Sequence, residues 1–187
     1  MNQPISALAD INRSIKYAPF FSDYRAKKAD INSKIALLYY ETGDIKTAIG
    51  YSDQSTTDIK KAVELSLQNV IVARNRASLE TTLSLVNPKL LDQAIVSLNH
   101  AQTLAPTDPK IPYHLGNLYF SKKEFTKAIE ALTQSVVLKP DYKEARLSLA
   151  SVYESLGQKD KARKEYQYIL DHIAPHDPFV INKLNTL

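Results

Sequence analysis

Apolar residues recur every three or four positions along most of the chain, which is the spacing of one face of an α-helix. Proline, glycine and short polar stretches interrupt this pattern and mark where helices end. Four glycines in 187 residues also leave few tight hairpin turns, which disfavours a β-protein. The pattern predicts an all-α protein with helices at residues 4–17, 22–42, 45–51, 58–86, 88–104, 110–121, 125–138, 143–156, 159–172 and 178–186.

The centre of the chain departs from this series of short helices. The polar stretch at residues 52–58 is predicted to be a loop, with Asp58 as the N-cap of the helix that follows. Residues 59–86 carry a helical apolar stripe and neither proline nor glycine, so we predict one long helix there. Such a helix either extends the array of shorter helices or fills part of a groove that these helices form.

A repeat with a step of 34 residues is present in the C-terminal half. The segment Pro112-x2-Leu115-Gly116-x2-Tyr119 returns as Arg146-x2-Leu149-Ala150-x2-Tyr153. The segment Ala128-x3-Leu132 returns as Ala162-x3-Tyr166, and one step earlier it reads Ala94-x3-Leu98. Small residues at such positions allow two helices to cross closely, and a proline after each pair stops the second helix.

These motifs resemble the tetratricopeptide-repeat (TPR) family, whose signature is an aromatic-x2-L-G-x2-Y helix followed by an A-x3-F helix and a proline. The resemblance implies a solenoid of helical hairpins wound into a right-handed superhelix, here with an irregular middle section of long helix. The matching signature residues are Tyr39, Ala48, Ala94, Leu115, Gly116, Tyr119, Ala128, Pro140, Ala150, Tyr153 and Ala162.

The resemblance divides the single domain 1–187 into four parts. Residues 1–57 are degenerate repeats, 58–91 a long inserted helix, 92–175 a regular array and 176–187 a capping helix. Pro112 and Arg146 depart from the family, because they stand where it carries tryptophan or another apolar residue. The steps from Ala7 to Ala48 and from Ala48 to Ala94 are 41 and 46 residues, so we also expect insertions in the middle.

A second set of residues points, by helical phase, away from the second helix of each pair. In the family this concave face binds extended peptides or partner helices, so the resemblance implies a non-catalytic protein-interaction scaffold. The face is either an open groove or one covered by the chain's own long helix. The residues predicted to line it are Leu37, Tyr40, Tyr113, Asn117, Phe120, Leu147, Ser151 and Glu154.

Composition and charge narrow the chemistry. The net charge is +4, from 24 Lys and Arg against 20 Asp and Glu, and we expect no nucleic-acid partner because no basic stripe on one helix face is evident. There is no cysteine, and Pro175 separates His172 from His176, so we expect no metal site. Phosphate-binding loops and catalytic motifs are missing, so neither a cofactor nor an enzymatic activity is expected.

The sequence leaves the cellular location and the oligomeric state of the protein open. No signal peptide and no apolar run long enough to span a membrane is evident, so we expect a soluble chain, cytoplasmic or extracytoplasmic. The helix order also loosely resembles the soluble TPR tail of bacterial O-antigen ligase- or polymerase-like membrane proteins, which would imply a role in surface glycan assembly. The open ends of a solenoid would allow a homodimer. RNA binding would need polar pairs recurring at the repeat step, and Asn117 with Ser151 is too short a series.

Overall fold

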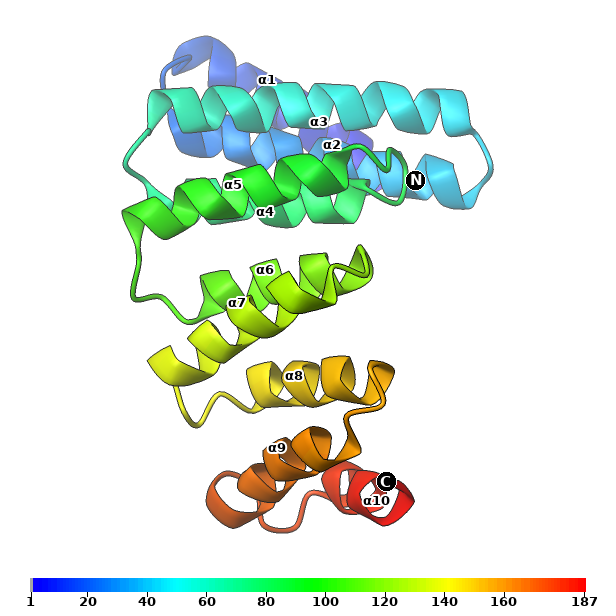
Figure 1. The fold of residues 1–187 in the computed structure, drawn as a ribbon. Coiled ribbons are helices and arrows are strands. Elements are labelled where there is room, and N and C mark those ends of the chain that lie inside the picture. Colours follow the sequence, from blue (N-terminus) through cyan, green and yellow to red (C-terminus); the bar gives the residue numbers. More distant parts are fainter. Residues whose placement is uncertain (1) are drawn as a thin grey trace. The chain divides into compact units, whose positions relative to one another are not determined.

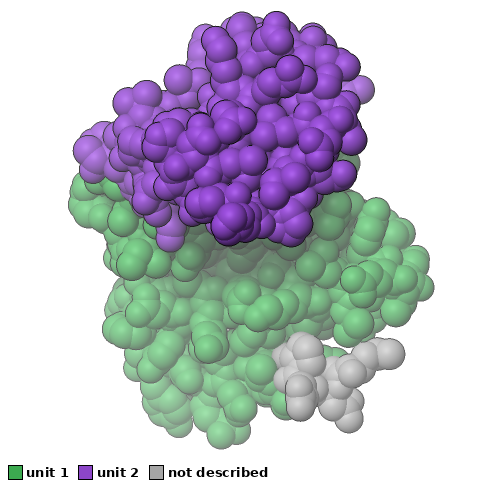
Figure 2. Space-filling view, turned by 90° about the horizontal axis from the view of Figure 1, so that it is seen from below, with its two compact units in different colours: residues 1–105 green, residues 106–187 purple. Residues whose placement is uncertain are grey.

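The computed structural model describes residues 2–187, and this part of the chain is all-α (Figure 1). It divides into two compact units, unit 1 (Met1–Ala105) and unit 2 (Pro106–Leu187), which Figure 2 colours separately. The helices of unit 1 are α1 (Asn2–Tyr17), α2 (Ser22–Glu41), α3 (Ile45–Leu65), α4 (Val70–Leu83) and α5 (Leu90–Leu104). Those of unit 2 are α6 (Lys110–Ser121), α7 (Phe125–Leu138), α8 (Lys143–Ser155), α9 (Lys159–His172) and α10 (Pro178–Thr186).

Each unit is built from helical hairpins, as the repeat predicts. In unit 1, α2 pairs with α3 and α4 pairs with α5, while α1 packs against α2. In unit 2, α6 pairs with α7 and α8 pairs with α9, while α10 packs against α9. The prediction of an all-α fold of paired helices is therefore confirmed.

The small residues of the repeat lie where the paired helices cross. Ala48, Ala94, Ala128 and Ala162 are all fully buried. Gly116 lies so close to α7 that a β-carbon added to it would stand 2.5 Å from Leu132 Cγ. The repeat motif thus marks the closest approaches between helices, where a larger side chain would force the axes apart.

The signature tyrosines end the first helix of three hairpins in the same way. At each of these helix ends, the residue four positions after the tyrosine lies in the left-handed backbone region. These residues are Gly43, Lys123 and Gly157, with φ between 60° and 83°. The amide of the next residue donates a 2.9 Å hydrogen bond to the carbonyl of Tyr39, Tyr119 or Tyr153. This six-residue closure satisfies carbonyls that a helix end would otherwise leave unpaired, and it turns the chain back onto itself.

The middle of unit 1 differs from the prediction. Helix α3 continues through residues 52–58, so the predicted loop and the predicted N-cap at Asp58 are both wrong. The chain instead turns at residues 66–69, so residues 58–91 do not form one inserted helix. Asn69 caps α4 by accepting hydrogen bonds from the amides of Ile71 and Val72 at 3.0 and 3.2 Å.

Tertiary partners explain why the polar stretch is helical. Ser55 and Asp58 are buried and face α2, where the Ser55 hydroxyl donates to the Ala29 carbonyl at 2.7 Å. The equivalent hydroxyl of unit 2, Ser135, donates to the Pro109 carbonyl at 2.7 Å. The long helices of unit 1 are thus α2 and α3, with 20 and 21 residues. No helix in the described part of the chain is both long and apolar enough to cross a bilayer.

Candidate interaction groove

A groove of about 610 Å³ lies between α2 and α4, the first helices of the two hairpins of unit 1. Its buried or half-buried lining is apolar and consists of Ala26, Ile59, Val72 and Leu79. Its exposed lining is mostly polar and consists of Asp23, Lys27, Asp30, Asn69, Ile71, Asn75, Ser78 and Thr82. An apolar floor with a few polar groups around it is the usual composition of a ligand site.

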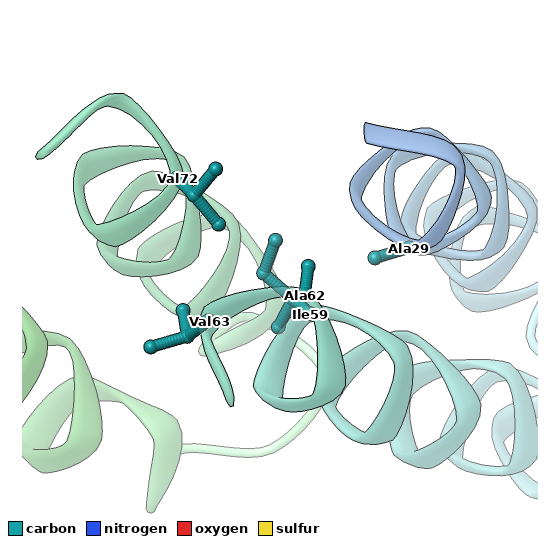
Figure 3. Close-up of a cluster of buried hydrophobic side chains, with 5 residues drawn as sticks. All are labelled: Ala29, Ile59, Ala62, Val63 and Val72. Atoms are coloured by element: carbon teal, nitrogen blue, oxygen red, sulfur yellow. The ribbon is translucent and has the colours of Figure 1, made fainter. Parts of the chain in front are cut away.

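Helical spacing brings these residues together. The α4 residues Ile71, Asn75, Ser78 and Thr82 recur every three or four positions and therefore share one face of the helix. A cluster of buried side chains beneath the groove holds α2, α3 and α4 together. Figure 3 shows its members, which are Ala29, Ile59, Ala62, Val63 and Val72. Because α4 forms one wall, the segment predicted as an inserted helix helps to form this groove and does not fill it.

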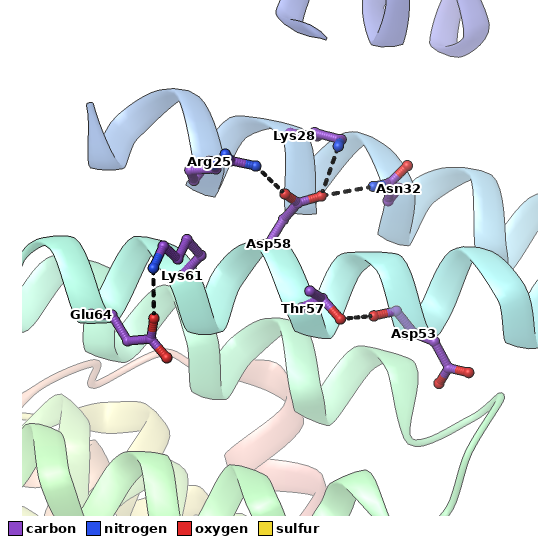
Figure 4. A network of polar contacts seen from close by, with 8 residues as sticks. All are labelled: Arg25, Lys28, Asn32, Asp53, Thr57, Asp58, Lys61 and Glu64. Atoms are coloured by element: carbon purple, nitrogen blue, oxygen red, sulfur yellow. Dashed lines mark hydrogen bonds and ion pairs between the residues drawn. The ribbon is translucent and has the colours of Figure 1, made fainter. Parts of the chain in front are cut away.

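A buried carboxylate fixes α2 to α3 (Figure 4). Asp58 is 6% exposed; its Oδ1 atom lies 3.1 Å from Arg25 Nη1, and its Oδ2 atom lies 3.2 Å from Lys28 Nζ. The amide of Asn32 donates to the same Oδ2 atom at 3.4 Å. Two cations and an amide compensate the desolvated carboxylate. This network orients α2, and with it the groove residue Lys27.

The sequence contained a signal for this network. Arg25, Lys28 and Asn32 are three or four residues apart and so lie on one face of a helix. An acid in the following segment is their natural partner, but the loop predicted at residues 52–58 gives Asp58 no fixed position opposite α2. A second buried carboxylate, Glu80, joins α4 to α5, because its two oxygens accept from Arg76 Nε at 2.7 Å and from Ser97 Oγ at 2.6 Å.

The predicted site residues of unit 1 lie on α2 beyond the groove. Leu37 is half-buried and Tyr40 is 39% exposed, and neither lines the groove. The polar residues of α4, above all Asn75 and Ser78, are missing from the prediction because one long helix over residues 59–86 contains no first helix that begins near residue 70.

The predicted residues of α6 are half-buried. Tyr113 and Phe120 pack against the buried cluster of Ala128, Leu132, Leu149 and Val152. The Tyr113 ring also lies 5.1 Å from the Tyr142 ring, and the Phe120 ring lies 6.1 Å from the Phe125 ring. Asn117, between them on the same helix, is half-buried as well. These aromatic side chains therefore contribute to the core of unit 2 while keeping an exposed edge.

The predicted residues of α8 are held by the neighbouring helices. Leu147 packs against the cluster around Ala150 and Tyr166, and Ser151 donates to the Leu147 carbonyl at 2.9 Å. Glu154 accepts from the Tyr166 hydroxyl at 3.0 Å and from Lys183 Nζ of α10 at 2.8 Å. Burial raises the pKa of Tyr166, and its bond to Glu154 raises that pKa further. The Glu154 carboxylate thus joins α8, α9 and α10.

Arg146, which departs from the family pattern, is buried in unit 2. Its Nε donates to the Pro140 carbonyl at 2.7 Å, and its Nη1 donates to Glu165 at 2.6 Å. The guanidinium carbon lies 3.3 Å from the centre of the Tyr168 ring. A flat cation stacked on an aromatic ring fills the space that a large apolar side chain fills in the family.

The described residues offer little for metal chemistry. Among residues 2–187, no group of three or more His, Cys, Asp or Glu side chains is arranged to hold a metal ion. His172 lies against Tyr168, with ring centres 4.2 Å apart.

Comparisons with known proteins agree with the repeat motif. A family model described as "TPR repeat" matches residues 116–157, and one described as "Tetratricopeptide repeat" matches residues 144–172. The crystal structure of MamA is 22% identical with a TM-score of 0.67, covering 96% of this chain and 88% of that one. TTC0263, a thermophilic TPR protein of Thermus thermophilus, is 21% identical with a TM-score of 0.62, covering 98% of this chain and 90% of that one.

A third similar structure is that of YrrB, described as a TPR protein with an unusual peptide-binding site. It is 14% identical with a TM-score of 0.66, covering 100% of this chain and 85% of that one. At these identities the likeness shows the fold, while the repeat models identify residues 116–172 as the repeat itself. Repeats of this kind build scaffolds with extended binding surfaces.

Proposed function

We propose, on the premise that this chain belongs to the tetratricopeptide-repeat family, that it is a non-catalytic scaffold which binds an extended peptide of a partner protein. The groove between α2 and α4 is the observation that carries this proposal. Its volume of about 610 Å³ lies within the range of small-ligand sites.

The length of the groove sets the length of the peptide. From Ile71 to Thr82 the lining of α4 advances by eleven residues, which is roughly 16 Å at the rise of an α-helix. An extended peptide covers that distance with about five residues. We therefore infer a contact of about five residues, with side chains alternating between the groove and solvent.

The chemistry of the lining suggests how the peptide is recognised. The carboxamide of Asn75 offers both a donor and an acceptor, which are the groups needed to bind a peptide backbone. Leu79 and the exposed Ile71 offer an apolar surface for one side chain of the peptide. The charged lining residues are of both signs, namely Asp23, Asp30 and Lys27, so a strongly charged peptide gains little electrostatic attraction here.

The predicted residues outside the groove belong to the same proposal. On α2, Leu37 and Tyr40 would extend the binding face, and in unit 2 the first helices α6 and α8 would supply its equivalent. The residues we propose for that face are Tyr113, Asn117, Phe120, Leu147 and Ser151. We expect Glu154 to contribute least, because both of its oxygens already have partners within unit 2.

The test begins with peptides of random sequence displayed on phage and selected on the immobilised chain. Fluorescence polarisation then measures the affinity of one selected peptide for the protein and its variants. Asn75→Ala should weaken binding roughly tenfold, because it removes two hydrogen bonds to the peptide backbone. Ser78→Tyr should abolish binding, because the larger side chain occupies the groove. Asn117→Ala tests unit 2 in the same way.

The matched control is Asn99→Ala, which removes the same side chain from an exposed position on α5 that does not line the groove. This variant should bind the peptide as the unaltered chain does. Circular dichroism confirms that every variant is folded. Equal affinities for Asn75→Ala, Ser78→Tyr and Asn99→Ala would show that the groove is not the binding site.

A further inference from the structure

Five large apolar side chains are exposed at one end of unit 1. We call them the apolar edge: Tyr17, Phe20 and Phe21 at the α1–α2 turn, and Leu67 and Ile71 at the α3–α4 turn. Each is between 51% and 83% exposed. Single exposed apolar residues are ordinary, but a group of this size in adjacent turns marks a surface that contacts another apolar phase.

The two turns lie at the same end of the hairpins. Helices α1 and α3 end there, and α2 and α4 begin there (Figure 1). Asp23, two residues after Phe21, lines the same groove as Asn69 and Ile71, which places the start of α2 beside the start of α4. The apolar side chains therefore stand at the tips of neighbouring turns.

The excess positive charge of the chain belongs to the same end. Residues 13–28 and 58–71, which form the two turns and the helix ends around them, contain seven Lys or Arg and three Asp or Glu. The remaining residues contain 17 of each sign, so the net charge of +4 is carried entirely by these two segments. Five of their cations, Arg13, Lys16, Lys27, Lys60 and Lys61, are exposed.

We propose that the apolar edge binds the surface of an anionic lipid bilayer. Aromatic and aliphatic side chains at turn tips insert at the boundary between headgroups and acyl chains, while nearby Lys and Arg are attracted to acidic headgroups. A second copy of this chain would bring like charges together, which disfavours self-association through this edge. The aliphatic Leu67 and Ile71 favour lipid over nucleic acid, which offers phosphates and flat bases.

This binding is peripheral, and it does not rest on the proposed function, although Lys27 and Ile71 also line the proposed peptide groove. Apolar insertion and electrostatic attraction act together, so the edge should distinguish vesicles by their charge. Each Lys or Arg near such a surface strengthens binding by about fivefold, and salt screens the effect.

The test is sedimentation of the full chain with vesicles of phosphatidylcholine alone and with vesicles that also contain phosphatidylglycerol. We expect binding to the acidic vesicles, weak binding to the neutral ones, and release by salt. The double variant Phe20→Ser/Leu67→Ser should bind acidic vesicles at least about tenfold more weakly, because it removes two inserting side chains. The double variant Lys16→Glu/Lys27→Glu should lose the preference for acidic vesicles.

The matched control is Val96→Ser, which removes an exposed apolar side chain of α5 that is 66% exposed and lies outside the two turns. It should bind vesicles as the unaltered chain does, and so should Asn75→Ala, which separates this test from that of the groove. Failure to bind acidic vesicles, or equal binding by Phe20→Ser/Leu67→Ser and Val96→Ser, would overturn the proposal. So would binding to RNA without binding to vesicles, or a dimer that Phe20→Ser/Leu67→Ser dissociates.

Discussion

The closest helix crossing of unit 2 provides a quantitative test of the packing. A methyl group added at Gly116 would lie 2.5 Å from Leu132 Cγ, 2.9 Å from Leu132 Cδ2 and 3.2 Å from the Ala128 carbonyl oxygen. Carbon atoms in contact are normally about 3.5–4.0 Å apart, so α6 and α7 would have to separate or Leu132 would have to leave its rotamer. Because Leu132 is fully buried, its side chain has no free space to enter.

The size of the effect follows from two opposing contributions. Overpacking a core costs about 1–3 kcal/mol, whereas alanine is favoured over glycine inside a helix by about 1 kcal/mol. We therefore expect Gly116→Ala to lower the free energy of unfolding by about 1 kcal/mol. Gly50→Ala is the matched control, because Gly50 lies within α3 and a β-carbon there meets no atom within 4 Å. It should raise the free energy of unfolding by about 1 kcal/mol.

A double-mutant cycle tests whether Leu132 is the cause. Leu132→Ala alone should lower the free energy of unfolding by about 2–5 kcal/mol, because it leaves a cavity. In the Leu132→Ala background, Gly116→Ala should be less destabilising, since the two Leu132 atoms that it would meet are gone and only the Ala128 carbonyl oxygen, at 3.2 Å, remains. Urea denaturation followed by circular dichroism at about 222 nm measures all four proteins. An effect of Gly116→Ala that is the same in both backgrounds would refute this account of the crossing.

Three further substitutions test the polar contacts. Asp58→Ala should lower the free energy of unfolding by about 3 kcal/mol, because two largely buried cations lose their partner; urea denaturation that gave unchanged stability would contradict this. Arg146→Lys should lower it by about 1–2 kcal/mol in the same measurement, because an ammonium group cannot serve both acceptors and stack on the ring. The hydrogen bond from Lys143 lowers the pKa of Asp177 below its ordinary value of 3.8. The stability that the ionised Asp177 side chain contributes is therefore complete above pH 3.8, and it is lost as the pH falls through the lowered pKa. Hydrogen exchange of α10 should therefore accelerate in that acid range, whereas Asp177→Asn should show no such transition.

The regular repeats could be predicted from the sequence because each of their features has a local cause. Small residues at Ala128 and Ala162 fix the helix crossings, and both are fully buried. The first helix of each hairpin in unit 2 ends with a tyrosine and, four residues later, a residue in the left-handed region. A proline follows the second helix of each of these hairpins. As a result, the five helices of unit 2 end within one residue of their predicted positions.

The middle of unit 1 could not be predicted from the same local signals. Ser55 and Asp58 read as a polar loop, but in a helix their spacing points both side chains at α2, where they find partners. The true turn at residues 66–69 contains neither proline nor glycine, and only the cap at Asn69 marks it. This error also hid part of the candidate site, because Asn75 and Ser78 became groove residues only once α4 was a first helix. The likeness to O-antigen ligase tails stays a prediction.

The measurement that tests the scaffold function most directly is the mapping of a bound peptide by nuclear magnetic resonance. The backbone amide signals of the ¹⁵N-labelled chain are recorded while the peptide selected on phage is added. We expect the largest shifts at the lining residues of α2 and α4, with Asn75 and Ser78 among them. Shifts confined to α3 and α5, or spread evenly over the chain, would contradict binding in the groove between the first helices.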